Sequence, residues 1–222
     1  MAKYLDIVYN QAQRPYTDYP SQLCRHLAEK FGMQKGQRLL DIGCGRGDFT
    51  RGFKDSGLEV AGIDREKGDS AMLQGIDVRI NQDLEHDPFP FPDESFDIVF
   101  SKSVIEHIWQ PSHFMQETRR VLKLGGRIVA MVPDWHSQMF IFYDDPTHVH
   151  PYTASGLQDL LAMHGFSNVE AELFYQLPVL WKYPALKILS RSLQLFGPVK
   201  KIEQNKFIRW SRELMILANA TK

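Results

Sequence analysis

The sequence lacks the features that mark zinc-stapled, secreted and membrane-spanning proteins. Its 222 residues contain two cysteines, Cys24 and Cys44, which excludes a four-cysteine zinc site and favours a reducing compartment. No run of about 18 apolar residues occurs, so we expect no transmembrane span. Residues 1–16 also lack the apolar core of a signal peptide. The sequence therefore predicts a soluble, cytoplasmic protein.

Neither sign of charge is in excess. Lys and Arg number 26, Asp and Glu number 27, and the formal net charge is −1, which argues against a dedicated nucleic-acid-binding protein. Internal repeats and low-complexity segments are absent from the sequence. With 43% hydrophobic and 24% charged residues, the composition is that of a globular protein, and the length fits a single domain.

Short apolar runs alternate with segments of helical periodicity along the chain. We expect strands in the run that begins at Arg38 and over residues 58–63, 76–80, 95–101, 127–132, 169–174 and 213–220. We expect helices over residues 20–31, 48–56, 112–124 and 155–164, with a long loop over residues 133–152. This alternation predicts an α/β fold with right-handed crossovers and a mostly parallel sheet.

A glycine cluster follows the first expected strand, and its pattern indicates what it binds. Gly43, Gly45 and Gly47 let the backbone turn sharply and approach a ligand closely. A dinucleotide-binding loop needs its third glycine at position 48, where this chain has Asp48. Asp64 lies 23 residues after Asp41, at the end of the second strand, where a carboxylate accepts both ribose hydroxyls. The pattern favours a nucleoside with a cationic tail and no phosphates, and S-adenosylmethionine fits that description.

Four ordered motifs carry a family resemblance. LLDIGCGRGDF, an acid that ends the second strand, PFPDESFDIVFSKSVIEHI and VLKLGGRIVAMVP together resemble the class I S-adenosylmethionine-dependent methyltransferases, in the branch with small-molecule, quinone and sugar substrates. The resemblance covers residues 37–132 and extends weakly to the end of the chain. It implies a Rossmann-like, doubly wound sheet of seven strands with an antiparallel last strand.

The same resemblance divides the single domain and assigns its cofactor residues. Residues 1–36 would form an N-terminal cap, 37–132 the cofactor-binding core, 133–177 the substrate side, 178–212 a basic helical insertion and 213–222 the last strand. S-adenosylmethionine would contact Asp41, Gly43, Cys44, Gly45 and Gly47 through its methionine part, Asp64 through its ribose, Arg65, Asp83 and Leu84 around the adenine, and Ser101 near its tail or sulfonium. For Asp83 an ordinary loop acid, and for Ser101 a structural role, remain alternatives.

Two histidines are candidates for the base that deprotonates a hydroxyl acceptor. The pKa of a free histidine lies near neutrality, and His107 follows the fourth strand, at the edge of the sheet where α/β sites lie. His148 lies in the loop after the fifth strand, and helix capping or wall packing is the alternative for both. We expect Tyr143, Asp144, His150 and Tyr152 to line the acceptor site. Asp144, Asp145, His148 and His150 have the types of a hard-metal or general-base site; we expect no metal there, and a bound metal ion remains an alternative.

Residues 178–212 concentrate positive charge. They contain eight Lys and Arg residues and one acid, Glu203, among many apolar side chains. One interpretation is a surface for an anionic acceptor, such as a lipid-linked sugar, an acyl carrier or a phospholipid interface. The other is a helical pair that packs on the sheet or on a second subunit. We expect methyl transfer to the oxygen of a small or carrier-linked acceptor. The alternatives are a nitrogen or carbon acceptor, or a non-catalytic binding protein.

Overall fold

The computed structural model describes Ile7 and residues 15–66, 68–80, 82–196 and 206–222. The strands are β1 (Arg38–Ile42), β2 (Glu59–Ile63), β3 (Asp77–Arg79), β4 (Phe96–Lys102), β5 (Leu122–Pro133), β6 (Ser167–Phe174) and β7 (Met215–Thr221). The α-helices are α2 (Tyr19–Lys30), α3 (Asp48–Asp55), α4 (Pro111–Val121), α5 (Trp135–Gln138), α6 (Ala154–Met163), α7 (Pro178–Lys182), α8 (Lys187–Phe196) and α9 (Lys206–Arg212). Three short 3₁₀ helices are η1 (Ile105–His107), η2 (Phe142–Asp144) and η3 (Pro184–Leu186).

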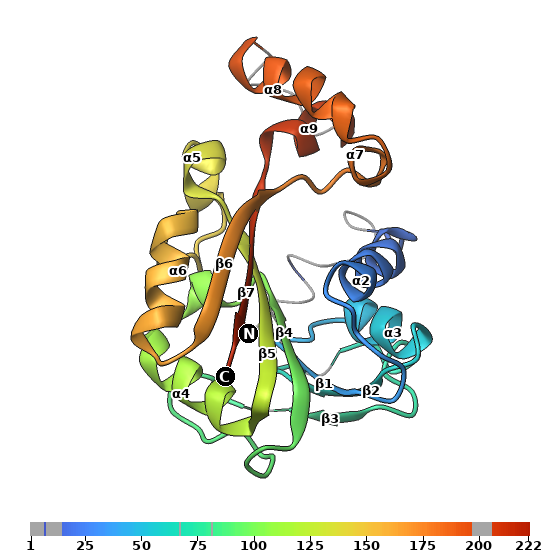
Figure 1. The fold of residues 1–222 in the computed structure, drawn as a ribbon, viewed down its shortest axis with the longest axis vertical. Helices are drawn as coiled ribbons and strands as arrows, with labels where there is room; N and C mark the ends of the chain where they lie inside the picture. The colour runs from blue at the N-terminus through green and yellow to red at the C-terminus, as the bar shows by residue number, and fades with distance from the viewer. Residues whose placement is uncertain (1–6, 8–14, 67, 81, 197–205) are drawn as a thin grey trace.

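The strands form one seven-stranded sheet in the order β3-β2-β1-β4-β5-β7-β6 (Figure 1). β1 to β5 pair in parallel, and β7 runs antiparallel to both of its neighbours, β5 and β6. The structure therefore confirms the predicted sheet, with its antiparallel last strand. Because the chain order reverses between β1 and β4, the carboxyl ends of these two strands flank the crevice in which such folds bind ligands.

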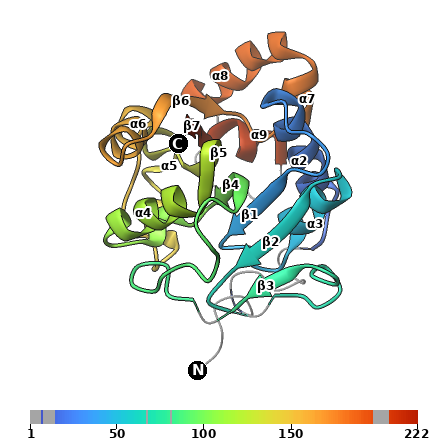
Figure 2. The same cartoon turned by 60° about the horizontal axis from the view of Figure 1, so that its bottom comes forward.

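Helices cover both faces of the sheet, as Figure 2 shows for α2 and α3 on one side and α4 and α6 on the other. Successive residues of β1 supply the two layers of core. Leu39 packs with Phe53 of α3, and Leu40 packs in the layer that contains Phe114 of α4 and Leu157 of α6. A strand that is buried on both faces reads as a continuous apolar run, which is why β1 was predictable from sequence.

The helix expected over residues 112–124 ends earlier, at Val121. Leu122 is extended and fully buried, and it pairs with Phe96 as the first residue of β5. Gly125 and Gly126, which follow the expected helix, lie inside β5, at a register shift of the β4–β5 pair. Burial of Leu122 against the sheet therefore outweighs the helical periodicity. The loop expected over residues 133–152 likewise contains α5 and η2.

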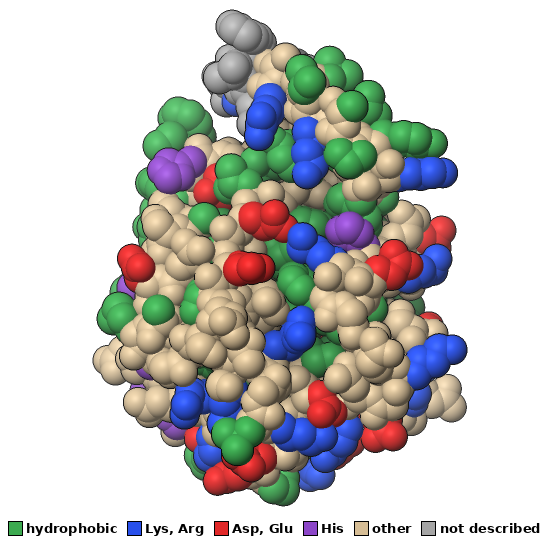
Figure 3. Space-filling view, in the orientation of Figure 1, with side chains coloured by type: hydrophobic (Ala, Val, Ile, Leu, Met, Phe, Trp, Pro, Cys, Tyr) green, Lys and Arg blue, Asp and Glu red, His purple; other side chains and the backbone are tan. Residues whose placement is uncertain are grey.

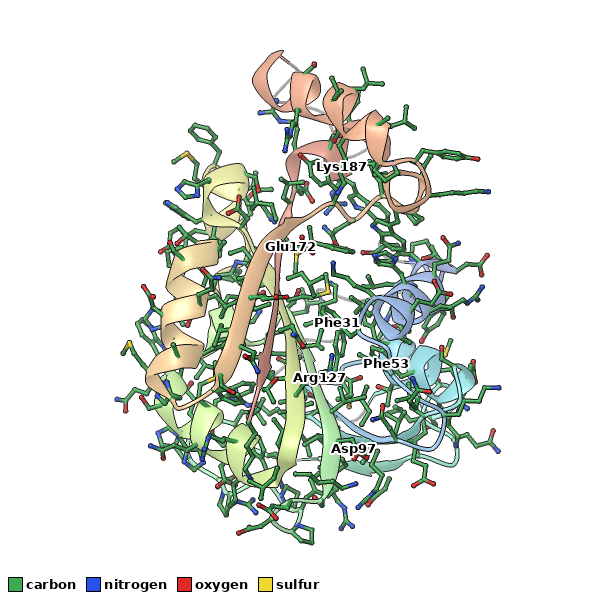
Figure 4. The ribbon with its side chains drawn as sticks, viewed as in Figure 1. Phe31, Phe53, Asp97, Arg127, Glu172 and Lys187 are labelled. Carbon is green, nitrogen blue, oxygen red and sulfur yellow. The ribbon has the colours of Figure 1, made fainter. Side chains whose placement is uncertain are left out.

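Charged side chains form hydrogen bonds at the edge of the sheet at which β1 and β4 begin. Asp97 accepts hydrogen bonds from the Arg38 backbone N–H and from Lys123 Nζ, each at 2.8 Å. Arg127 donates to the carbonyl of Phe31 at 3.0 Å, which attaches the end of α2 to β5 (Figure 4). This edge has a structural role, and the chemistry-bearing residues lie at the opposite edge.

The described residues of the predicted basic insertion form α7, η3, α8 and α9 between β6 and β7, whereas its residues 197–205, with Lys200, Lys201 and Glu203, lie outside the described residues. The described part of the insertion projects beyond the end of β5 and lies next to α2 (Figure 1). Aromatic rings make this contact: Trp181 stacks on His26 with centroids 4.5 Å apart, and Tyr19 meets Trp210 at 4.7 Å. Within the described part of the chain, every helix is too short or too polar to span a bilayer.

Candidate functional site

The glycine loop joins the carboxyl end of β1 to α3. Gly43, Gly45 and Gly47 all have positive φ, between 53° and 95°, which other residues adopt only with strain. A Cβ on Gly43 would overlap Cγ2 of Val104, and a Cβ on Gly47 would lie 2.5 Å from Cδ2 of Leu73. The segments after β1, β2 and β4 therefore meet at this loop, and only glycine permits the approach.

Asp64, directly after β2, holds this loop in place. Its Oδ2 accepts the backbone N–H of Gly45 at 2.7 Å, and its Oδ1 accepts that of Glu66 at 2.9 Å. Burial raises the pKa of the carboxyl, and the two N–H donors oppose that rise. A carboxylate oxygen has a second lone pair, so Asp64 can still accept hydroxyl groups. Its proposed contact with ribose stays a prediction.

Asp41 lies deeper, at the end of β1. Its carboxylate is buried and accepts the hydroxyl of Thr50 at 2.6 Å. Burial raises its pKa to about 7, and the Thr50 hydrogen bond opposes the rise. Cys44 is a free, buried thiol whose pKa is raised by burial and by the neighbouring Asp41 and Asp64. Two partly desolvated carboxylates make this end of the loop suited to a cation and hostile to phosphate.

The residues predicted to surround adenine lie beside Asp64. Arg65 is exposed, with its guanidinium 3.9 Å from the carboxylate of Asp83. The backbone N–H of Glu85 donates to Asp83 at 3.0 Å and lowers the pKa of that carboxyl. Leu84 is half-buried and packs against the core layer under α4 and α6. The structure thus brings these three residues to one edge of the sheet, and their contacts with a cofactor stay predictions.

Ser101 lies in β4 opposite Ile42 of β1, near the carboxyl ends of these two strands. Its side chain is buried, and its hydroxyl has no partner among the described residues. Two residues later, Ser103 has φ 56°, and its N–H donates to the carbonyl of Met131 at 2.9 Å. This left-handed turn redirects the chain from β4 into η1.

His107 and His148 come together although they are 41 positions apart. Their ring centroids are 4.7 Å from each other. Nδ1 of His107 lies 2.9 Å from the hydroxyl of Thr147, and Nδ1 of His148 lies 2.5 Å from the carbonyl of Phe142. Burial and the adjacent His148 lower the pKa of His107. A depressed pKa keeps His107 neutral at pH 7, as a base must be.

Glu106 is a site residue that the sequence analysis did not single out. It is fully buried beneath the two histidines, and neither carboxylate oxygen has a partner among the described residues. Burial raises its pKa to about 8. Its carbonyl accepts the N–H groups of Val149 and His150 at 2.8 and 3.0 Å, which joins the loop after β5 to η1. The sequence signal that could have identified Glu106 is its position, directly before the candidate base His107 and after the carboxyl end of β4.

The four predicted acceptor-site residues divide into two pairs. His150 Nε2 lies 2.9 Å from the carbonyl of Trp109. Tyr152 is half-buried, and burial together with the charge of Glu106 raises its pKa to about 12. Both therefore lie at the Glu106 cluster. Tyr143 and Asp144 are exposed on η2, further out on the surface.

Comparisons with known proteins show which proteins this chain is similar to. Residues 40–130 match the family model described as a methyltransferase domain. A relative from Mycolicibacterium smegmatis named "Probable S-adenosylmethionine-dependent methyltransferase" is 30% identical over 140 residues, which are 59% of this chain and 52% of the relative. The chain thus spans about half the length of that relative. A Ruegeria protein named "Ubiquinone biosynthesis O-methyltransferase" is 28% identical over 166 residues, 67% of each chain.

A solved structure is similar over the whole chain. It is a S-adenosylmethionine-dependent methyltransferase from Archaeoglobus fulgidus, with a TM-score of 0.67, 22% identity and coverage of 99% of this chain and 100% of that one. At that identity the likeness establishes the fold. The sheet order and both helical layers described above are those of this structural class.

Proposed function

We propose that the chain is a class I S-adenosylmethionine-dependent methyltransferase domain, and that it transfers a methyl group from S-adenosylmethionine to an oxygen of a small, carrier-linked or lipid-linked acceptor. The observation that carries the proposal is the arrangement at the carboxyl edge of the sheet. The glycine loop and Asp64 follow β1 and β2, the Glu106–His107–His148 cluster joins the segments after β4 and β5, and these four parallel strands end at the same edge of the sheet.

The residues present fit the cofactor. Gly43 and Gly47 form a bend that side chains would fill, and Asp41 and Asp64 favour the ammonium group and the ribose hydroxyls. The hydroxyl of Ser101, which has no partner among the described residues, lies in β4, on the opposite side of β1 from β2. S-adenosylmethionine has a cationic sulfonium, an ammonium and no phosphate, so its charges match these carboxylates. When bound, it supplies a methyl group that is already activated for displacement.

The chain itself must then align the acceptor and remove its proton. His107 and His148 are the groups we propose for the proton, because they lie side by side and are half-buried. His150 and Tyr152 lie next to them and are placed to orient the acceptor. Deprotonation matters most for a hydroxyl, which supports oxygen as the acceptor atom, and the name of the Ruegeria relative agrees.

The basic insertion is the surface we propose for the acceptor's anionic or lipid part. Figure 3 shows hydrophobic and basic side chains together over α7 and α8. Tyr183, Leu186, Ile188 and Leu189 are exposed there, beside the exposed Lys182, Lys187 and Arg191. The insertion begins after β6, and the strand that follows it, β7, pairs at its first residue with Pro133, the last residue of β5. An acceptor held on it would lie at the same end of the sheet as the histidines.

Titration calorimetry with S-adenosylmethionine tests the cofactor half of the proposal. We expect one site per chain, and we expect Asp64→Ala to weaken binding by about 1.5–3 kcal/mol, the size of a hydrogen bond to a charged group. Asp77→Ala is the matched control, because Asp77 is an exposed acid at the opposite end of the neighbouring strand β3. Thermal unfolding of each variant reports whether the fold is retained. Equal affinity of the Asp64 variant would contradict the ribose role.

Transfer of a radioactive methyl group tests the acceptor half. Quinone, glycolipid and sugar-nucleotide fractions serve as acceptors. Hot hydriodic acid releases the labelled methyl group from an ether more readily than from an N-methyl group, and it does not release a C-methyl group. We expect an O-methyl product and a rate loss on the order of 100-fold for His107→Ala or His148→Ala, with cofactor binding retained. Cofactor binding without transfer to any fraction would favour a non-catalytic binding protein.

A further inference from the structure

The buried carboxylate of Glu106 needs a partner that the described residues do not supply. It is fully buried, and both of its oxygens lack a hydrogen-bond partner there. Buried polar side chains are nearly always hydrogen-bonded, and a buried charge is paired or bound to a metal. Its position is fixed, because two backbone N–H groups from the loop after β5 donate to its carbonyl. The backbone of Glu106 is therefore fixed, while its carboxylate has no hydrogen-bond partner among the described residues.

Two imidazoles share that space with Glu106. One nitrogen of His107, one nitrogen of His148 and one carboxylate oxygen of Glu106 all lie within 4.8 Å of one another. Ligands of a tetrahedral zinc ion, at about 2.0–2.1 Å from the metal, lie about 3.4 Å apart. A closing movement of roughly 1 Å would complete such a site, and both histidine rings are half-buried rather than fully enclosed.

The outer partners of both histidines are those of metal ligands. The carbonyl of Phe142 can only accept, so Nδ1 of His148 carries the hydrogen and the lone pair lies on Nε2. Nδ1 of His107 lies 3.2 Å from the carbonyl of Thr147, which fixes the same tautomer. The Thr147 hydroxyl in turn donates to Asp145 at 2.6 Å. Metal-binding histidines characteristically donate their second nitrogen to a carbonyl or carboxylate in this way.

We propose that Glu106, His107 and His148 bind one divalent transition-metal ion of the zinc class. Two imidazoles and one carboxylate are a ligand set that such ions take, and three protein ligands leave a position open. The ligand set differs from the one considered in the sequence analysis, since it replaces Asp144, Asp145 and His150 by Glu106 and His107. With the ion bound, His107 and His148 would be ligands rather than bases, and the ion would lower the pKa of an acceptor hydroxyl at the open position. That role rests on the proposed function, whereas the metal site does not.

Zn²⁺ titration of the metal-stripped, full-length protein, in competition with a chromophoric chelator, tests the site. We expect one Zn²⁺ per chain. Glu106→Gln, His107→Ala and His148→Ala should each weaken binding more than about 100-fold, and Thr147→Val by about 10-fold, the range of outer partners. His136→Ala is the control, because this exposed histidine of α5 lies outside the cluster. Circular dichroism and thermal unfolding establish that each variant is folded.

The outcomes are distinguishable. Absence of Zn²⁺ binding, or equal binding by Glu106→Gln and His136→Ala, would overturn the metal site. In that case a protein that still binds S-adenosylmethionine keeps the proposed function, with the histidines as bases. Conversely, Zn²⁺ binding that depends on all three residues supports the metal site even if S-adenosylmethionine fails to bind, a result that would overturn the proposed function alone.

Discussion

Gly36 and Gly43 have the same backbone handedness and very different surroundings. Gly36 has φ 82° and would meet nothing within 4 Å of a new Cβ, whereas Gly43 has φ 72° and would overlap Val104. We expect Gly36→Ala to lower the free energy of unfolding by about 1–2 kcal/mol, the cost of a left-handed alanine. Gly43→Ala should lose about 1–3 kcal/mol more, from overpacking. Urea unfolding measures both.

The difference between the two variants isolates the close approach of the β1 and β4 loops. If Gly43→Ala is no less stable than Gly36→Ala, then Val104 moves aside without penalty and the loop is looser than its contacts indicate. In that outcome the glycine is required only for its φ.

Asp41 should make the stability of the ligand-free protein depend on pH. Burial raises its pKa from 3.8 to about 7, so the folded chain holds this proton more tightly than the unfolded chain. The free energy of unfolding should therefore fall as pH rises from about 4 to 7. Asp41→Asn does not titrate and should remove up to about 1 kcal/mol per pH unit of that slope. Urea unfolding at a series of pH values measures it.

Asp77→Asn is the control for this titration, because its exposed carboxylate pairs only with Arg79 in the described structure. It should keep the slope of the unmodified protein. A slope that persists in Asp41→Asn would mean that Asp41 is charged at low pH in the folded state, with Thr50 stabilising it. The other buried acids near the loop are present in both variants and cancel from the comparison.

At the residue scale, sequence predicted the glycine loop better than the histidine cluster. Gly43, Gly45 and Gly47 occupy alternate positions of one short motif. Each has a positive φ, which only glycine adopts without strain. Glu106 and His148 meet only because two loops fold over the same edge of the sheet. No local pattern encodes that meeting, so Glu106 was missed and the metal alternative was assigned to other acids.

At the scale of elements, apolar periodicity located all seven strands within a few residues. The error lay at the junction of α4 and β5, where Leu122 fits either a helical face or a buried strand. Tertiary packing decides such cases, and periodicity cannot. The insertion shows the same limit. Its helices were expected, but their contact with α2 depends on Trp181 and Trp210 meeting His26 and Tyr19 from the other end of the chain.

For the whole molecule, the insertion is the feature from which we predict binding to a membrane surface. Exposed Ile188 and Leu189 lie on α8, 72% and 53% exposed, among Lys182, Lys187 and Arg191. Apolar side chains flanked by basic ones suit the surface of an anionic bilayer. We expect the protein to sediment with phosphatidylglycerol vesicles and less with phosphatidylcholine vesicles. Raising the salt concentration should weaken this binding, because surface charges are screened.

Replacing both apolar residues, Ile188→Ser with Leu189→Ser, should weaken vesicle binding at least tenfold, because each buried side chain of this size contributes about 1.5–3 kcal/mol. Leu124→Ser is the matched control, since Leu124 is 77% exposed and lies in β5 near its first residues, away from the insertion. Equal binding by the two variants would show that charge alone attracts the protein. Absence of binding by the unmodified protein would contradict the prediction that this patch binds a bilayer.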